Sequence, residues 1–145
     1  MNESFSDMAS QAAEFYAHGE SSWSIGSDIM KEGVVRYMDE PSRDGRSINS
    51  ADQYVEEMDV HQSSGVYNRM FYVLAHLPQW DVKQAFEVMV KANMDYWTPY
   101  TNFNEGGCGV INAAQDLGLS ADDVKHALIQ VAIDGSNCDI PAPTA

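Results

Sequence analysis

Positively charged side chains are scarce in this sequence. Its 145 residues include 8 lysines and arginines against 22 aspartates and glutamates, which gives a net charge of -14 at pH 7. A chain with this balance repels phosphate backbones and anionic lipid, and it has no basic stripe that would bind either. We therefore expect no nucleic acid and no membrane partner. The acidic residues are spread along the chain, which is typical of a solvated, highly soluble surface.

Long hydrophobic runs are missing as well. No stretch approaches about 18 continuous apolar residues, so the sequence predicts no transmembrane helix. No charged start followed by an apolar run marks a signal peptide. Hydrophobic residues still make up 44% of the chain, which is enough for the core of a single globular domain.

Cysteine occurs only at Cys108 and Cys138, outside any C-x-x-C pattern. This spacing argues against a zinc knuckle or a thioredoxin-like redox motif, and a single disulfide is the favoured interpretation. A disulfide implies an oxidising compartment, whereas the missing signal peptide points the other way.

Common catalytic motifs are also absent. The sequence contains no H-E-x-x-H, no G-x-S-x-G, no P-loop and no G-x-G-x-x-G. Residue spacing alone therefore predicts no particular reaction.

Helical spacing of apolar residues dominates what is present. It predicts five helices, over residues 3–18, 63–77, 82–97, 110–117 and 121–133. Gly19 is expected to end the first helix, and Asp81 and Ser120 to cap two later ones. The stretch "TPYTNFNEGG" is expected to separate two helices, and residues 20–59 to be mostly irregular, with a short β-like run, "VVRYM". The predicted fold is mostly α, a bundle of about five helices with long irregular loops and little β structure.

Carboxylates cluster on the first helix. Glu3 and Asp7 are four residues apart and project from one face, with Gln11 one turn further on and Glu14 nearby. Two like charges at this spacing repel, so a compensating group is expected. Acids placed near a helix N-terminus, where the helix dipole favours them, are the preferred explanation on spacing alone. A metal or a basic partner is the alternative.

Three further residues have side chains that could take part in chemistry. His61 has a carboxylate nearby at Asp59, which can fix its tautomer and keep it cationic, as suits a proton donor or an oxyanion stabiliser. An ordinary loop histidine is the alternative. Arg36 lies in an apolar-looking run and needs a carboxylate or carbonyl partner, in a structural ion pair or in a binding site. His76 lies within the apolar helix expected over residues 63–77, and a histidine in such a position is more often a core residue than a ligand.

Several long stretches resemble one protein family in the same order. They are "MNESFSDMASQAAEFY", "IGSDI", "VRYMDEPSRDGRSI", "DVHQSSGVYNRMFYVLA", "WDVKQAFEVMVKANMDYWT" and "NFNEGGCGVINAAQDLGLSADDV". Together they resemble the C-terminal domain of the thermolysin family of zinc endopeptidases, most of all its vibriolysin and pseudolysin branch. The resemblance implies a domain over residues 1–138, and 139–145 would be a Pro/Ala tail or the start of a linker.

The resemblance implies roles for the acidic helix and its surroundings. Glu3 would be the third zinc ligand, and Asp7 would orient one of the zinc-binding histidines. Arg36 would bind a substrate carbonyl. Ile25 and Val35 would help to wall the apolar pocket for the residue after the scissile bond.

It also implies that His61, oriented by Asp59, donates a hydrogen bond to the oxyanion of the tetrahedral intermediate. Cys108 and Cys138 match a disulfide position of that branch.

Two departures from the family are visible. Members of the family bind calcium near this first helix through several carboxylates; Glu14 is retained, but Gln11 and Ser22 stand where acids are expected. A site with two fewer charged ligands binds calcium more weakly, so weak or absent calcium binding is expected.

The larger departure is that the H-E-x-x-H helix of the family is missing from this sequence. The expectation is that Met1 is an internal methionine, that an N-terminal zinc-binding domain is the partner, and that this chain alone is inactive. The whole protein would be a secreted bacterial endopeptidase that hydrolyses bonds before hydrophobic residues. The alternative is a non-catalytic helical binding module, or an inactive fragment of such a peptidase, in which Glu3 and Asp7 are simply solvated.

Overall fold

The protein is described by a computed structural model that covers most of the chain. The described residues are 2–25, 36–55, 58, 63–98, 101–135 and 138. Within them lie five α-helices, α1 (Asn2–His18), α3 (Gly65–Ala75), α4 (Val82–Asp95), α5 (Phe103–Asp116) and α6 (Ala121–Ile129). The described β structure is limited to β1 (Ser24–Ile25) and β2 (Arg36–Tyr37), and two 3-10 turns follow, η1 (Pro41–Asp44) and η2 (Ala51–Gln53). The prediction of a mostly helical fold is confirmed.

The helix ends are set by the residues that the sequence marks for them. Gly19 follows α1 with a φ of 79°, a left-handed conformation that glycine adopts without a steric penalty. The Asp81 side chain accepts a hydrogen bond from the Gln84 N–H at 2.8 Å, and the Ser120 hydroxyl accepts one from the Asp123 N–H at 3.2 Å. Both N-caps were predicted.

Helix α5 differs from the prediction. It begins at Phe103, well before residue 110, because Asn102 caps it by accepting a hydrogen bond from the Glu105 N–H at 2.8 Å. Two of its glycines lie where a side chain would meet neighbouring residues. A Cβ on Gly107 would lie 3.1 Å from a methyl group of Ile133, and one on Gly109 would lie 3.0 Å from Tyr96. The end of the stretch expected to separate two helices, including Gly107, therefore lies inside α5, where the absence of side chains on Gly107 and Gly109 allows close packing.

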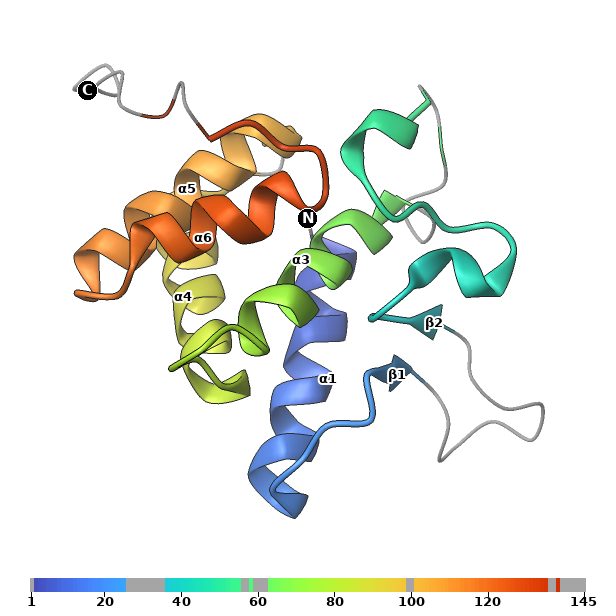
Figure 1. Ribbon diagram of the computed structural model, residues 1–145, viewed down its shortest axis with the longest axis horizontal. Helices are drawn as coiled ribbons and strands as arrows, with labels where there is room; N and C mark the ends of the chain where they lie inside the picture. The colour runs from blue at the N-terminus through green and yellow to red at the C-terminus, as the bar shows by residue number, and fades with distance from the viewer. Residues whose placement is uncertain are drawn as a thin grey trace.

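Helix α3 lies at the centre of the molecule, with α4, α5 and α6 on one side and the two short strands on the other (Figure 1). It packs against α1, α4 and α6. Its core-facing side chains Met70, Phe71 and Leu74 are fully buried. Removal of this apolar surface from water is the main stabilising contribution to such a helix, which by itself would be too short to persist.

The strands β1 and β2 form an antiparallel pair in which Ser24 faces Tyr37 and Ile25 faces Arg36. The Met38 N–H extends the pairing by donating to the Trp23 carbonyl at 2.8 Å. The pair lies between α1 and η1, both of which it contacts. This small ribbon carries Arg36 to the side of α1.

Cys108 and Cys138 form a disulfide, with their Cα atoms 5.1 Å apart, as predicted. The bond ties α5 to the chain beyond α6. His76 is not a core residue, in contrast to the prediction: it follows the last turn of α3, is exposed, and its ring lies tilted against those of Tyr72 and Trp23.

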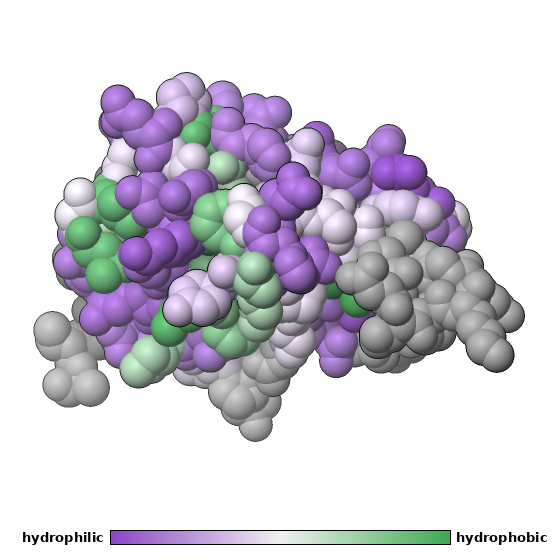
Figure 2. Space-filling view, turned by 90° about the horizontal axis from the view of Figure 1, so that it is seen from below, coloured by the Kyte–Doolittle hydropathy of each residue, from purple (hydrophilic) through white to green (hydrophobic). Residues whose placement is uncertain are grey.

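The face of the molecule in Figure 2 is largely hydrophilic, and hydrophobic residues occur on it in separate patches. None of the helices in the described part of the chain is long and apolar enough to cross a membrane.

Candidate functional site

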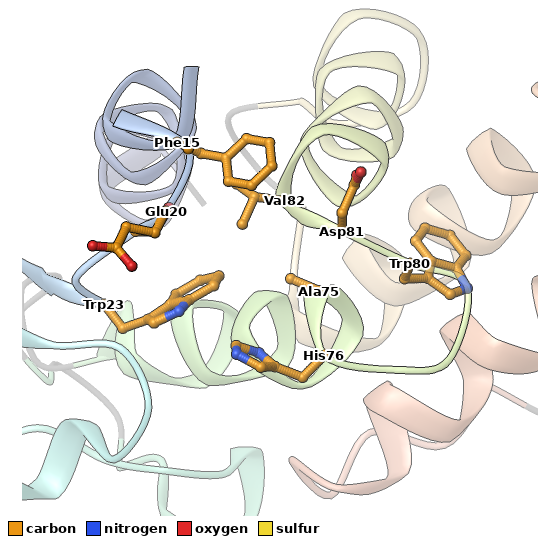
Figure 3. Close-up of a pocket in the computed structure, with 10 residues that line it drawn as sticks. Phe15, Glu20, Trp23, Ala75, His76, Trp80, Asp81 and Val82 are labelled. Carbon is orange, nitrogen blue, oxygen red and sulfur yellow. The ribbon is translucent and has the colours of Figure 1, made fainter. Parts of the chain in front are cut away.

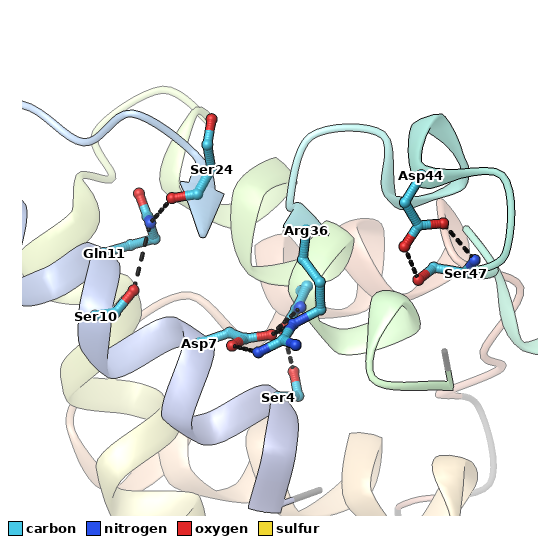
Figure 4. Close-up of polar contacts among 9 residues, drawn as sticks. Ser4, Asp7, Ser10, Gln11, Ser24, Arg36, Asp44 and Ser47 are labelled. Carbon is cyan, nitrogen blue, oxygen red and sulfur yellow. Dashed lines mark hydrogen bonds and ion pairs between the residues drawn. The ribbon is translucent and has the colours of Figure 1, made fainter. Parts of the chain in front are cut away.

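The candidate site is centred on Asp7, whose carboxylate is almost fully buried, at 3% exposure. Arg36 donates to both of its oxygens, from Nη2 to Oδ1 at 2.7 Å and from Nε to Oδ2 at 2.9 Å. Figure 4 shows the guanidinium reaching from β2 to the side of α1. A planar, two-pronged contact of this kind fixes the orientation of both groups. Of the two partners expected for Arg36, a carboxylate or a carbonyl, the structure shows the carboxylate.

Asn68 completes the surroundings of Asp7 and was not predicted. Its Nδ2 donates to Asp7 Oδ2 at 2.8 Å, and its Oδ1 accepts from the Ser4 hydroxyl at 2.7 Å. All three side chains are buried. The sequence signal for it is a polar amide in the middle of an otherwise apolar helix, since a buried amide requires hydrogen-bond partners. Asn68 links α3 to α1 and holds the carboxylate from a second side.

Arg36 compensates the repulsion between Glu3 and Asp7 that their spacing implies. The hydrogen bond to Asp7 raises the pKa of Arg36, burial opposes this, and the negative charges of Asp7, Glu3 and Asp44 raise it further. The guanidinium is therefore permanently charged at any physiological pH. The reading of Asp7 as a simply solvated acid is wrong, because its carboxylate is buried and bonded on two sides.

Ile25 lies beside Arg36 because the two residues face each other across the β1–β2 pair. Directly opposed residues in an antiparallel pair project from the same face of the sheet, with Cβ atoms about 5 Å apart. Ile25 is half-buried. An apolar side chain and a charged guanidinium thus stand next to each other on one surface.

Glu3 is half-buried one turn before Asp7 on α1. Its carboxylate is a suitable zinc ligand, but structural and catalytic zinc sites take three or four protein ligands. Over residues 2–25, 36–55, 63–98 and 101–135, no group of three or more His, Cys, Asp or Glu side chains could hold a metal ion. Among the described residues, Glu3 thus belongs to no such group.

The remaining predicted residues have different outcomes. Glu14 lies on α1 and accepts hydrogen bonds from the backbone and hydroxyl of Ser22. Val35, Asp59 and His61 lie outside the described residues, so their predicted roles are not tested.

Two hollows lie away from this cluster. A cavity of about 340 Å³ opens where the end of α1 meets the end of α3, and it is lined by Glu20, Trp23, His76 and Trp80 among others (Figure 3). An apolar groove of about 550 Å³ runs between α1 and α4, past Tyr16, which is 94% exposed. Neither hollow is lined by Glu3, Asp7 or Arg36.

Comparison with known proteins identifies the family. Residues 1–133 match the profile of the family described as thermolysin metallopeptidase, alpha-helical domain. The chain is 64% identical over 142 residues to the zinc metalloproteinase MspA of Legionella longbeachae, an alignment that covers 95% of this chain and 27% of that protein.

Two Vibrio proteins give a similar result. The neutral protease of Vibrio proteolyticus is 51% identical over 145 residues, covering 99% of this chain and 24% of that protein. The hemagglutinin/proteinase of Vibrio cholerae is 50% identical over 144 residues, covering 99% of this chain and 24% of that protein. The chain spans about a quarter of the length of these relatives. It therefore belongs to the thermolysin family of zinc metallopeptidases, and it is the family's helical C-terminal domain.

Proposed function

We propose that this chain is the C-terminal part of a secreted, zinc-dependent endopeptidase that hydrolyses peptide bonds before hydrophobic residues. The observation that carries the proposal is the buried Asp7–Arg36 pair, which lies one helical turn from Glu3 and directly beside Ile25. A guanidinium with an apolar neighbour thereby lies beside α1, within the electrostatic influence of the Glu3 carboxylate. The domain would cover residues 1–138, and 139–145 would be a tail or the start of a linker.

Arg36 would bind a carbonyl oxygen of the substrate. A guanidinium has five N–H groups, and the contacts to Asp7 use one on Nε and one on Nη2. The N–H groups on the far edge remain suited to a carbonyl acceptor, while Asp7 prevents the guanidinium from rotating. Ile25, together with Val35, would wall the pocket for the hydrophobic residue after the scissile bond.

Glu3 would be the third zinc ligand, and the other two would be histidines of an N-terminal domain. When bound, zinc supplies Lewis-acid chemistry and a water of lowered pKa. Asp7 would accept a hydrogen bond from one of those histidines and so orient its ring. A carboxylate has about four acceptor positions, and Arg36 and Asn68 use three of them at Asp7, which leaves one for this bond.

His61 would donate a hydrogen bond to the oxyanion that forms when the substrate carbonyl is attacked, with Asp59 holding its ring in the required orientation. These two roles follow from the family resemblance alone.

The partner domain would supply the H-E-x-x-H helix, so peptidase activity would require both parts. The Cys108–Cys138 disulfide supports an extracellular location for the whole protein, since such bonds persist in oxidising compartments. Calcium would bind weakly or not at all, since Gln11 and Ser22 stand where acids are expected.

The experiment joins this chain to the N-terminal part of a close relative and measures cleavage of a peptide with a hydrophobic residue after the scissile bond. Glu3→Gln should abolish zinc binding and activity. Arg36→Lys should lower kcat/KM roughly tenfold to a hundredfold, because one charged two-pronged contact is lost. His61→Ala should lower kcat about a hundredfold to a thousandfold.

Matched controls are available in the same fusion. His126→Ala removes an exposed histidine on α6, and Glu40→Gln removes an exposed carboxylate away from α1. Both should leave kcat and KM unchanged. Full activity after His61→Ala would reject its role, and full activity after Glu3→Gln would reject the zinc site.

A further inference from the structure

The loop after α1, residues 19–25, lies where the family resemblance implies a calcium site. Calcium takes six to eight oxygen ligands, several of them carboxylates. Of the three positions expected to supply acids here, only Glu14 does so, and the others are Gln11 and Ser22. An ion could use these side chains only if their polar atoms were not already bonded within the protein.

Gln11 is fully buried, with 0% exposure, and both ends of its amide are bonded to the loop. Its Oε1 accepts from the Trp23 N–H at 2.8 Å. Its Nε2 donates to the Ser24 carbonyl at 3.0 Å (Figure 4). The Ser21 hydroxyl donates to the Gln11 carbonyl at 2.7 Å. The side-chain amide therefore fixes two successive residues of the loop, Trp23 and Ser24, and the Gln11 backbone carbonyl holds Ser21.

Glu14 holds the same loop one turn further along α1. Its Oε2 accepts from the Ser22 N–H at 2.8 Å and from the Ser22 hydroxyl at 2.9 Å. The hydroxyl also lies 3.2 Å from Oε1. Both carboxylate oxygens thus already contact the donors of Ser22, whose hydroxyl also lies 3.2 Å from the Ser24 carbonyl.

These residues do not fit a calcium ion. They offer a single carboxylate, both oxygens of which already contact Ser22, and the Gln11 amide is uncharged and bonded to the loop at both ends. We propose that Gln11, Glu14 and Ser22 form a hydrogen-bonded clamp that takes the place of the metal, so that the loop is held to α1 without calcium.

The clamp has a structural consequence that reaches the candidate site. Trp23 has a φ of 58°, a conformation unfavourable for a bulky residue, and it persists only where its surroundings impose it. Gln11 holds its N–H, and the Trp23 carbonyl accepts from Met38, next to β2. The Trp23 ring packs against Phe71 and His76, forming one wall of the cavity in Figure 3. The clamp therefore sets the position of β1 and, across the pair, of Arg36.

The test measures thermal unfolding of the full 145-residue chain in calcium chloride and in the chelator EGTA. A ligand that binds the folded state raises Tm in proportion to the logarithm of its concentration once above Kd. We expect Tm to be equal in both solutions up to 10 mM calcium. A calcium-dependent rise that Glu14→Gln removes would overturn the proposal. The result does not depend on peptidase activity, so it is separable from the proposed function.

Variants of the clamp sharpen the test. Gln11→Ala should lower Tm by several degrees, because the Trp23 N–H loses its partner in the interior. Glu14→Ala removes the acceptor of the Ser22 N–H and should leave the fold intact while hydrogen exchange of the Ser22 amide quickens. Unchanged exchange of this amide in Glu14→Ala would overturn the role of the clamp.

The paired substitution Gln11→Glu with Ser22→Asp restores the expected acids. It should lower Tm in EGTA through repulsion among three carboxylates, and calcium should restore it. Equal Tm values of this variant in both solutions would overturn the conclusion that residues 11 and 22 decide against the metal.

Discussion

The helical core, α1 with α3 to α6, and the polar segment, the described residues of 19–55, are held by different forces. In the helical core, large side chains such as Phe71, Leu74 and Met89 are completely removed from water. In the polar segment, buried apolar side chains are few, and side-chain hydrogen bonds set the path of the chain. Asp44 accepts from Ser47, and Asn49 accepts from the Ser42 N–H at 2.8 Å.

The contacts of the helical core mainly stabilise the fold, whereas those of the polar segment mainly orient particular side chains. Apolar contacts are non-directional and scale with buried area, so they give the helical core most of its free energy. Hydrogen bonds are individually modest but directional, so they fix the orientation of particular groups. The candidate site lies where the two regions meet, with Asp7 on the helical core and Arg36 on the polar segment.

The largest effect is expected in the helical core. Phe71→Ala should lower the free energy of unfolding by about 3 to 5 kcal/mol, because it leaves a cavity against fully packed neighbours. Urea denaturation measures this. Ile129→Ala, on the exposed side of α6, is the control and should change stability by less than about 0.5 kcal/mol. Equal effects of the two substitutions would show that packing does not dominate this region.

The disulfide should come next. Replacing Cys108 and Cys138 together by serine should lower the free energy of unfolding by about 3 to 4 kcal/mol, because the bond closes a loop with a sequence separation of 30. Reduction of the unaltered chain should give the same loss in a calorimetric scan. A stable reduced protein would mean that packing of α5 and α6 suffices without the covalent link.

The contact between the two regions should have an intermediate effect. Arg36→Met leaves the buried Asp7 carboxylate without its cation and should cost about 2 to 3 kcal/mol in the free energy of unfolding. Arg46→Met removes an exposed arginine of the same segment and serves as the control. If the two variants are equally stable in urea, the Asp7–Arg36 pair does not join the regions energetically.

The smallest effect is expected within the polar segment and depends on pH. Burial alone would raise the pKa of Asp44, but hydrogen bonds from the Ser47 hydroxyl and from the Ser47 and Arg46 N–H groups lower it below its ordinary value. A depressed carboxyl pKa adds stability that is fully present above the unfolded value, about 3.9, and is lost as the pH falls through the folded value.

Asp44→Asn should therefore be less stable than the unaltered chain by at most about 1 kcal/mol at pH 7. The difference should shrink below about pH 4. Urea denaturation across this pH range measures it, with Glu87→Gln, an exposed residue of α4, as the control. A difference independent of pH would mean that the Asp44 charge is not the stabilising feature.

Much of the helical core was predictable because its signals are local. The apolar spacing and the caps at Gly19, Asp81 and Ser120 gave the start or end of three helices. The early start of α5 was missed because its glycines are locally unfavourable for a helix, and their benefit is close packing against Ile133 and Tyr96. Ile133 and Tyr96 both lie outside α5, so the local sequence of the helix does not reveal this packing.

The sequence alone determined the helical class, the disulfide, the family and the residue types of the candidate site, since composition, periodicity and motif order are properties of the chain. Only the tertiary structure decided which groups meet: Arg36 with Asp7, Asn68 with both Asp7 and Ser4, and Gln11 with the loop that follows α1. The physical reason is that a buried polar group must find a partner, and the fold, not sequence distance, determines which partner lies within reach.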